Sequence, residues 1–283
     1  MIDLDAVTPD QYCRQRAARS GSSFYYSFLF LPIERRLAIT ALYAFCREVD
    51  DVVDDIDDPV VARATLDWWR AEVDRLFDGK PEHPVTQALA RPVSRFRLPR
   101  ERFLDILDGM AMDLDYNRYP DFPTLEVYCY RVAGAVGLLA ASIFGYEDDA
   151  TLEYARTLGI ALQLTNIARD IGEDVRRNRI YLPLDELQSF GVTTDDLILF
   201  RETPAVGALI SHQIARARAY YDRAFASLPA VDRRSQRAGI IMARIYRALL
   251  DELASEGPRL LNHRISLTPV RKLWIAWRTW LRP

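Results

Sequence analysis

Two stretches of the sequence carry carboxylates at the spacing of helix turns. In residues 37–58, LAITALYAFCREVDDVVDDIDD, Asp50 and Asp54 lie four residues apart. A helix with about 100° per residue brings both onto one stripe with Tyr43 and Arg47. Like charges at this spacing destabilise an isolated helix. A divalent cation that prefers oxygen ligands offsets the repulsion, and magnesium bound in this way completes its shell with water and substrate phosphates.

The second stretch, QLTNIARDIGED at residues 163–174, repeats the arrangement. Gln163, Asn166, Asp170 and Asp174 share one helix face within about 80°. Asn166 can add a neutral oxygen ligand to the carboxylates. Two such faces in one chain predict a clamp for metal-bound diphosphate, with on the order of two or three magnesium ions. The predicted metal ligands are Asp50, Asp54, Asn166, Asp170 and Asp174.

Arginines accompany both stretches. Arg47 and Arg169 lie beside the carboxylates, and Arg176, Arg177 and Arg179 follow the second stretch. Guanidinium groups bind phosphate oxygens with two parallel hydrogen bonds. Together with magnesium they would neutralise the charge that develops on diphosphate as an allylic C–O bond breaks. The pattern therefore predicts the ionisation of a prenyl diphosphate.

A solvated acidic helix end is the alternative explanation of the first stretch taken alone. Asp51 and Asp55 lie about 100° away from the stripe, and we predict that they are solvated or support the ligands. The presence of two stretches with arginine and polar residues in phase argues against the alternative. Other cofactor chemistry fits less well. The sequence has three histidines but no Glu-x-x-His motif, zinc cluster, P-loop or dinucleotide fingerprint.

The spacing of proline and of apolar residues predicts an all-α chain. Proline repeatedly stands at helix starts, where its missing N–H costs nothing, and the sequence contains no period-2 alternation with hairpin turns. Because no linker is evident, we expect one domain over residues 1–283. The organising helix covers residues 37–58, and further helices are predicted at residues 9–18, 59–77, 84–96, 99–116, 125–144, 149–174, 204–227, 231–255 and 269–281.

Composition indicates a soluble globular protein. Hydrophobic residues make up 49% and charged residues 27% of the chain, which argues against disorder. The three cysteines, Cys13, Cys46 and Cys129, lack metal-ligand spacing and indicate a reducing compartment. The N-terminal sequence MIDLDAVTPDQY lacks the basic and apolar regions of a signal peptide. We predict a cytoplasmic protein without a nucleic-acid partner.

Glycine and aromatic residues indicate what the helices enclose. Gly134 and Gly137 each cost a helix about 1 kcal/mol relative to alanine, so something is expected to approach them closely. Helix packing and a bound isoprenoid chain are both open explanations. Aromatic rings near the acidic stretches would form core or line a pocket for a carbocation, which aromatic faces stabilise.

The C-terminal segment differs in charge from the rest of the chain. After Glu256 the sequence has six basic residues and no acidic one. Within residues 268–283, the run RKLWIAWRTWLR places Trp274, Trp277 and Leu281 near one helix face. Such a helix either lies in an anionic membrane interface or packs onto the bundle as a final core helix. Both explanations fit the sequence.

These motifs resemble those of the squalene and phytoene synthases over nearly the whole chain. The strongest parts are YAFCREVDDVVD (43–54), YCYRVAGAVG (128–137) and QLTNIARDIGEDVRRNRIYLP (163–183). The segment SGSSFYYSFLFLP (20–32) is most similar to the presqualene diphosphate synthases of bacterial hopanoid pathways. Phytoene synthases typically carry a histidine and a basic residue where this chain has Ser20 and Ser22.

The resemblance implies an isoprenoid synthase helical bundle around a central cavity, with the two acidic stretches facing each other across it. It implies catalytic roles for Tyr43, Arg47, Asp50, Asp54, Asp170 and Asp174. It implies substrate contacts from Ser22, Ser23, Phe24, Tyr128, Val132, Ala133, Gly137, Gln163, Asn166, Arg169, Tyr246 and Arg264.

The implied reaction is the magnesium-dependent, head-to-head condensation of two farnesyl diphosphates to presqualene diphosphate, with release of diphosphate. Because no reductase module is evident, we predict that the reaction stops there and needs no NADPH. Condensation of two geranylgeranyl diphosphates to phytoene, or squalene synthase-type activity, is the alternative within the same class. Intact aspartates argue against a non-catalytic assembly factor of the same fold. Peripheral contact with the inner membrane face would follow if the C-terminal helix binds lipid.

Overall fold

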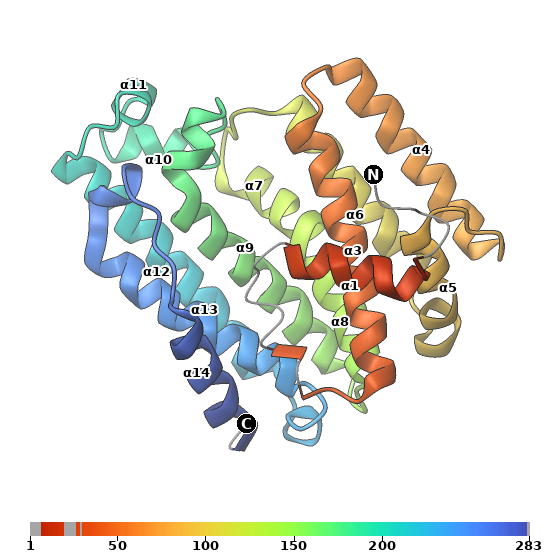
Figure 1. The fold of residues 1–283 in the computed structure, drawn as a ribbon. Coiled ribbons are helices and arrows are strands. Elements are labelled where there is room, and N and C mark those ends of the chain that lie inside the picture. Colours follow the sequence, from red (N-terminus) through yellow and green to blue (C-terminus); the bar gives the residue numbers. More distant parts are fainter. Residues whose placement is uncertain (1–6, 20–26, 29, 282–283) are drawn as a thin grey trace.

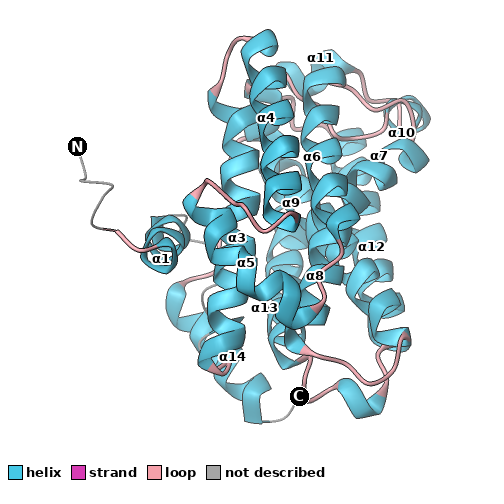
Figure 2. Ribbon diagram, turned by 90° about the vertical axis from the view of Figure 1, so that its right-hand side faces the viewer, coloured by secondary structure: helices cyan, strands magenta, loops and turns pink. Residues whose placement is uncertain are grey.

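The structure is a computed structural model that describes residues 7–19, 27–28 and 30–281. Its helices surround a long central helix, α9, as Figure 1 shows. Within the described residues every regular element is helical, apart from an isolated bridge between Arg118 and Ile180. The view in Figure 2 likewise shows helices joined by loops. The all-α prediction is confirmed.

The elements follow the proline and periodicity signals of the sequence closely. In chain order they are α1 (Pro9–Arg19), α3 (Ile33–Asp55), α4 (Pro59–Phe77), α5 (Pro84–Phe96), α6 (Arg100–Asp115), α7 (Phe122–Cys129), a π-helical turn (Tyr130–Gly134), α8 (Ala135–Phe144), α9 (Ala150–Arg176), α10 (Leu184–Ser189), α11 (Thr194–Ile198), α12 (Pro204–Ser227), a 3₁₀ turn (Ala230–Asp232), α13 (Arg237–Glu256), a 3₁₀ turn (Gly257–Leu261) and α14 (Pro269–Leu281).

Several predicted boundaries were wrong, and two of the errors have a local cause. The organising helix begins at Ile33 rather than at residue 37. It ends at Asp55, because Asp58 instead caps the next helix by accepting a hydrogen bond from the backbone N–H of Val60 (2.8 Å). The helix predicted at residues 231–255 begins only at Arg237. The 3₁₀ turn before it contains Asp232, whose carboxylate accepts hydrogen bonds from the loop ahead of α9.

The run from Phe122 to Phe144 is nearly continuous helix, but it contains the π-helical turn at residues 130–134. By length and composition alone this run could cross a membrane. It packs against α6 and α9 in the interior of the bundle, however. Its apolar composition is therefore explained by its place in the core.

Two hydrophobic clusters meet in the middle of the molecule. One contains Leu42 and Phe103 with other residues of α1, α3, α4, α5, α6 and α8, and the other contains Ile160 and Leu250 with residues of α9, α12 and α13. Val132 packs against both clusters. A cavity lies between them and takes side chains from each. The fold thus contains the apolar cavity that the sequence predicts.

Candidate active site

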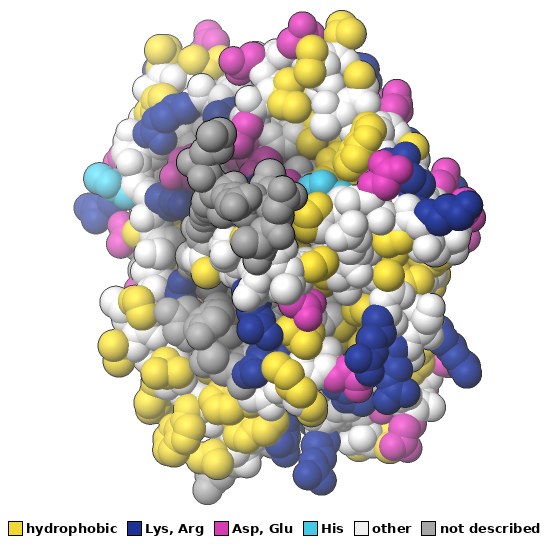
Figure 3. Space-filling model, turned by 45° about the vertical axis from the view of Figure 1, so that its right-hand side comes forward, with side chains coloured by type: hydrophobic (Ala, Val, Ile, Leu, Met, Phe, Trp, Pro, Cys, Tyr) yellow, Lys and Arg dark blue, Asp and Glu magenta, His cyan; other side chains and the backbone are white. Residues whose placement is uncertain are grey.

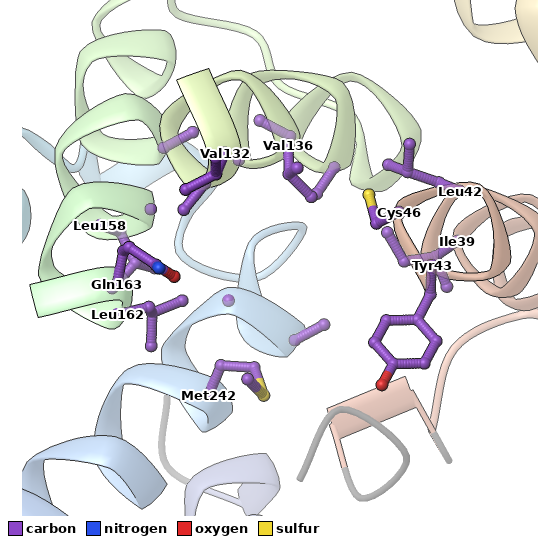
Figure 4. Close-up of a pocket in the computed structure, with 18 of the residues that line it drawn as sticks. Ile39, Leu42, Tyr43, Cys46, Val132, Val136, Leu158, Leu162, Gln163 and Met242 are labelled. Atoms are coloured by element: carbon purple, nitrogen blue, oxygen red, sulfur yellow. The ribbon is translucent and has the colours of Figure 1, made fainter. Parts of the chain in front are cut away.

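The cavity is apolar along most of its length. Figure 4 shows Ile39, Tyr43 and Cys46 of α3 across from Leu158 and Leu162 of α9, with the helical run 122–144 along one side and α13 below. Four of the side chains predicted to contact the prenyl chain line this space, namely Tyr128, Val132, Ala133 and Gly137. The predicted contacts Ser22, Ser23 and Phe24 lie outside the described residues.

One end of the cavity is polar, because the two acidic stretches meet there. Asp50 and Arg47 of α3 line this end together with Gln163 and Asn166 of α9. The Asn166 Nδ2 donates a hydrogen bond to Gln163 Oε1 at 3.2 Å, but its Oδ1 is buried and has no hydrogen-bond partner among the described residues. An unsatisfied buried oxygen is costly, so this atom marks a position for a donor or a cation.

Arginines join the two acidic stretches. Asp54 accepts hydrogen bonds from Arg179 Nη1 at 2.7 Å and from Arg177 Nη1 at 3.0 Å. The backbone N–H of Arg179 also donates to the carbonyl oxygen of Asp174 at 2.8 Å. Arg176, predicted to belong to the same group, instead lies over the ring of Phe200, with 4.6 Å between the guanidinium carbon and the ring centroid. Two of the three arginines that follow the second acidic stretch are therefore tied to the carboxylate of Asp54 in the first.

Asp170 is held by arginines as well. Arg169 donates to it from Nε at 2.8 Å, and Arg264, which follows α13, donates from Nε at 2.9 Å. Tyr246 of α13 lines the cavity and hydrogen-bonds with Arg169. The structure thus places both C-terminal residues named in the sequence analysis beside the second acidic stretch.

On α3, Arg47 pairs with Asp50 and also with Asp51, at 2.9 Å from Nη2 to Oδ1. Asp51 pairs in addition with Arg16 of α1. Asp51 therefore supports an arginine at the cavity, which agrees with the predicted supporting role. Tyr43 lies one turn before Arg47 on the same face and points into the cavity in Figure 4.

Burial raises the pKa values of two carboxylates here. It raises the pKa of Asp50 to about 6 although Arg47 opposes the change. Burial and the neighbouring Asp170 raise the pKa of Asp174 to about 8. Each shift means that the charged form is costly in the metal-free protein. A bound cation would stabilise the charged carboxylates and so offset that cost.

The donor set fits magnesium in kind, because Asp50, Asp54, Asn166, Asp170 and Asp174 offer only oxygen. Among the residues that the structure describes, no three acidic, histidine or cysteine side chains lie together closely enough to enclose an ion by themselves. The buried, unpartnered Asn166 Oδ1 is the oxygen best prepared for one. Magnesium commonly takes one or two carboxylates and completes its shell with substrate phosphates, which matches this spread arrangement.

A half-buried carboxylate that the sequence analysis missed lies beside this end of the cavity. Asp113, in the last turn of α6, accepts hydrogen bonds from the hydroxyls of Tyr128 at 2.9 Å and Tyr181 at 2.8 Å. The two tyrosine rings stack with centroids 5.2 Å apart. Arg179 acts electrostatically on Asp113 as well as on Asp50 and Asp174. Asp113 therefore holds the hydroxyls of Tyr128 and Tyr181 together, within the electrostatic influence of Arg179.

Asp113 also makes a testable contribution to stability. Burial raises its pKa to about 6, although Arg179 and both tyrosine hydroxyls favour the carboxylate. The unfolded aspartate has a pKa of about 3.9, so the folded protein holds this proton more tightly. The associated stability is present below about pH 4 and is lost as pH rises through about 6. In the wild type, this group is expected to lower the free energy of unfolding by roughly 1 to 3 kcal/mol as pH rises over that range. The Asp113→Asn variant should lack this decrease.

Urea denaturation without divalent metal, at a series of pH values, measures this difference. Asp50 and Asp174 titrate in both proteins, so the difference between the two profiles reports Asp113 together with its electrostatic effect on those carboxylates. Parallel pH profiles for the wild type and Asp113→Asn would show that Asp113 titrates normally and would contradict this account of its burial.

The helix glycines are explained by packing. A Cβ added at Gly137 would lie 2.3 Å from the carbonyl oxygen of Ala155, and one added at Gly159 would lie 2.3 Å from that of Ala133. The run 122–144 and α9 therefore touch backbone to backbone. Of the two explanations that the sequence left open, close helix packing holds for Gly137, which also lines the cavity.

Comparison with known proteins agrees with this arrangement. The squalene/phytoene synthase family model matches residues 17–271. The chain belongs to the squalene/phytoene synthase family. Members of this family are prenyltransferases, and the match includes both acidic stretches, Asp113 and Tyr246.

Relatives in the family are identical to this chain at about a third of the aligned positions. A phytoene synthase from Arthrospira platensis is 36% identical over 283 residues, covering 95% of this chain and 92% of that protein. A chloroplastic phytoene synthase from Narcissus pseudonarcissus is 36% identical over 267 residues, which cover 92% of this chain but 63% of that longer protein.

Two solved structures of the family have the same fold. A dehydrosqualene synthase in complex with a ligand superposes with a TM-score of 0.88 at 30% identity, covering 96% of this chain and 95% of that one. A squalene synthase from Alicyclobacillus acidocaldarius has a TM-score of 0.78 at 31% identity, covering 88% and 94% of the two chains. The bundle around a central cavity is therefore the family's isoprenoid synthase fold.

Proposed function

We propose that this protein condenses two farnesyl diphosphates head to head into presqualene diphosphate. The observation that carries the proposal is the cavity, which has apolar walls and one end where two acidic helix faces and several arginines meet. A prenyl diphosphate is divided in the same way, into an apolar prenyl chain and a charged diphosphate group. The similarity to a dehydrosqualene synthase and a squalene synthase supports the assignment.

Binding of the donor substrate follows from the charges at the polar end. Arg47, Arg177 and Arg179 would exchange part of their pairing with aspartates for the diphosphate oxygens. Magnesium, when bound by Asp50, Asp54, Asn166, Asp170 and Asp174, neutralises the diphosphate and makes it a better leaving group. The apolar walls exclude water, which would otherwise capture the allylic cation as farnesol.

The bond changes balance without a reductant. The C1–O bond of the first farnesyl diphosphate breaks and diphosphate leaves with the electron pair. The 2,3 double bond of the second substrate then attacks that C1 and leaves a cation at C3 of the acceptor. Loss of a proton from the donor's C1 supplies the electron pair that closes the cyclopropane between this carbon and C2 and C3 of the acceptor, whose own C1 keeps the second diphosphate. Burial raises the pKa of Tyr128 well above its ordinary value, so this hydroxyl stays protonated. The released diphosphate is therefore the better proton acceptor.

Product analysis tests the proposal and its alternative. The purified protein is given magnesium with farnesyl diphosphate, with geranylgeranyl diphosphate, or with both, in the absence of NADPH, and products are identified by mass spectrometry. We expect presqualene diphosphate from farnesyl diphosphate. Phytoene formed from geranylgeranyl diphosphate as the main product would favour the alternative instead, which the identity to phytoene synthases supports.

Two aromatic rings of the cavity wall offer a test of chain length. Phe28 and Phe144 both line the cavity, with ring centroids 6.4 Å apart. We propose that these rings limit the length of the bound chain, so that they obstruct a C20 chain more than a C15 chain. We expect Phe28→Ala to raise turnover of geranylgeranyl diphosphate relative to farnesyl diphosphate by about tenfold or more.

The matched control is Phe77→Ala, a phenylalanine at the end of α4 that is partly buried and is not among the cavity residues. Competition between the two substrates, followed by product mass spectrometry, gives the ratio. If Phe28→Ala and Phe77→Ala leave the same ratio as the wild type, the ring at position 28 does not limit chain length.

A further inference from the structure

The C-terminal helix α14 has two faces with different environments. One face packs on α13, where Ala276 and Thr279 are buried. The opposite face is open, with large apolar side chains that are about half exposed: Leu273 47%, Trp274 52%, Trp277 55% and Leu281 59%. The predicted packing onto the bundle is thus seen for one face of the helix, and the predicted membrane contact stays a proposal for the open face.

This open face belongs to a larger patch at one end of the molecule. In Figure 3, hydrophobic side chains gather at the lower edge, with lysine and arginine side chains nearby. The most exposed of the large apolar residues on α14 is Val270, at 78%. Large contiguous apolar patches are rare on the surfaces of soluble monomeric proteins, and they commonly mark interaction sites.

A basic groove lies next to the patch, between α13 and α14. It is lined by Arg244, Arg271 and Arg278 with four uncharged residues, Ala248, Trp274, Ile275 and Thr279. The Nη1 of Arg244 donates to Thr279 Oγ1 at 3.2 Å, and the Arg278 guanidinium lies over Trp274 with 5.2 Å to the ring centroid. Arg271 also pairs with Glu252, which lies outside the lining.

The arginines of the groove repel one another in the absence of an anion. Burial lowers the pKa of Arg244, and the charges of Arg233 and Arg278 lower it further. A phosphate group placed in the groove would meet guanidinium groups from two helices and a hydroxyl from Thr279. Such convergent donors are the usual recognition elements for phosphate.

We propose that this end of the protein docks onto an anionic phospholipid bilayer, with Leu273, Trp274, Trp277 and Leu281 in the interface and a lipid phosphate in the groove of Arg244, Arg271 and Arg278. Tryptophan and leucine beside arginine are the composition of interfacial helices. The inference goes beyond the proposed reaction and does not rest on its substrate.

Charge decides between a bilayer and a second copy of the chain. A two-fold dimer through this face would bring the three groove arginines of one copy toward those of the other. An anionic membrane supplies the complementary charge instead. The chain after Glu256 has no acidic residue, and Glu252 offsets Arg271 alone among the groove arginines in the ion pairs of the described residues. The attraction is therefore expected to be stronger at low salt and to weaken as salt is added.

Vesicle flotation of the full-length protein tests the proposal without any substrate, so its failure is distinct from failure of the proposed reaction. Vesicles are made of phosphatidylcholine alone or of phosphatidylcholine mixed with phosphatidylglycerol. We expect binding to the mixed vesicles, with little binding to the neutral ones and loss at high salt. Equal flotation with both vesicle types, or with neither, would overturn the proposal.

Variants separate the apolar from the basic contribution. The double change Trp274→Ser and Trp277→Ser is expected to abolish flotation, and Arg278→Gln and Arg244→Gln are each expected to weaken it about fivefold. The controls are Trp68→Ser on α4, where the tryptophan is 40% exposed, and Arg91→Gln on α5, where the side chain is 84% exposed. Circular dichroism checks that each variant is folded.

Three further results would count against membrane docking through α14. If the double tryptophan variant floats like the wild type, the open face of α14 does not enter the bilayer. If light scattering instead shows a concentration-dependent dimer that the same variant loses, the face joins two copies of the chain. If the two control variants lose binding as fully as the α14 variants, the effect is not specific to this end of the molecule.

Discussion

Asp54→Asn is expected to lower the rate of condensation by about a thousandfold, because neutralising the leaving diphosphate supplies several kcal/mol and about 1.4 kcal/mol corresponds to a factor of ten. Asp54 lies where both acidic stretches are bridged, since it accepts hydrogen bonds from Arg177 and Arg179. Asparagine keeps the shape of the side chain but removes its charge. The helix should survive, because Asp54 is in the last turn of α3 and its side chain is 24% exposed.

The matched control is Asp55→Asn, the same change one residue further along α3, on its exposed side. Diphosphate release under saturating magnesium measures the rate, and far-ultraviolet circular dichroism measures helix content. Full activity of Asp54→Asn would remove Asp54 from the metal site. If Asp55→Asn lost as much activity as Asp54→Asn, the rate would depend on the total charge at this end of the helix. The position of Asp54 on the stripe with Tyr43, Arg47 and Asp50 would then not matter.

Gly137→Ala is expected to lower the free energy of unfolding by about 1 to 3 kcal/mol or more, the usual cost of overpacking a core. The new Cβ would lie 2.3 Å from the carbonyl oxygen of Ala155 and 3.0 Å from its carbonyl carbon. These are backbone atoms of α9, so the contact is relieved only if two helices separate. The better helix propensity of alanine offsets about 1 kcal/mol of this cost.

Gly207→Ala provides the control for that substitution, since it too lies inside a helix. Its added Cβ would be 3.2 Å from a ring carbon of Pro258, and no backbone atom is among its nearest neighbours. We expect stability within about 1 kcal/mol of the wild type, with a gain if the ring can shift. Urea denaturation of the three proteins gives the comparison. If Gly137→Ala is as stable as the wild type, the backbone contact with α9 does not require glycine.

The sequence allowed the helices and the meeting of the two acidic stretches to be predicted. Proline at the first turn and apolar residues at helical spacing are local signals, so α4, α5, α12 and α14 have the predicted bounds. The stripe through Tyr43, Arg47, Asp50 and Asp54 follows from helix periodicity alone. Two acidic faces on otherwise apolar helices are explained if both bind the same metal-bound diphosphate. From this requirement we expected the two faces to lie together at one site.

Features that depend on tertiary contacts were not predicted. Asp113 became visible only when folding brought Tyr128 and Tyr181 to it from distant parts of the chain. The short helices α10 and α11 have 6 and 5 residues, too few for periodicity to register. The different directions of Arg176 and Arg179 depend on how α9 ends, which composition does not specify.

The most direct test of the central claim is the stoichiometry of diphosphate release. Purified protein, magnesium and farnesyl diphosphate are mixed without NADPH, and phosphorus NMR follows substrate, product and free diphosphate. The account predicts one diphosphate released for every two farnesyl diphosphates consumed, with the second diphosphate retained on a C30 product. Absence of any released diphosphate, or release of one for each substrate with farnesol as the product, would contradict it.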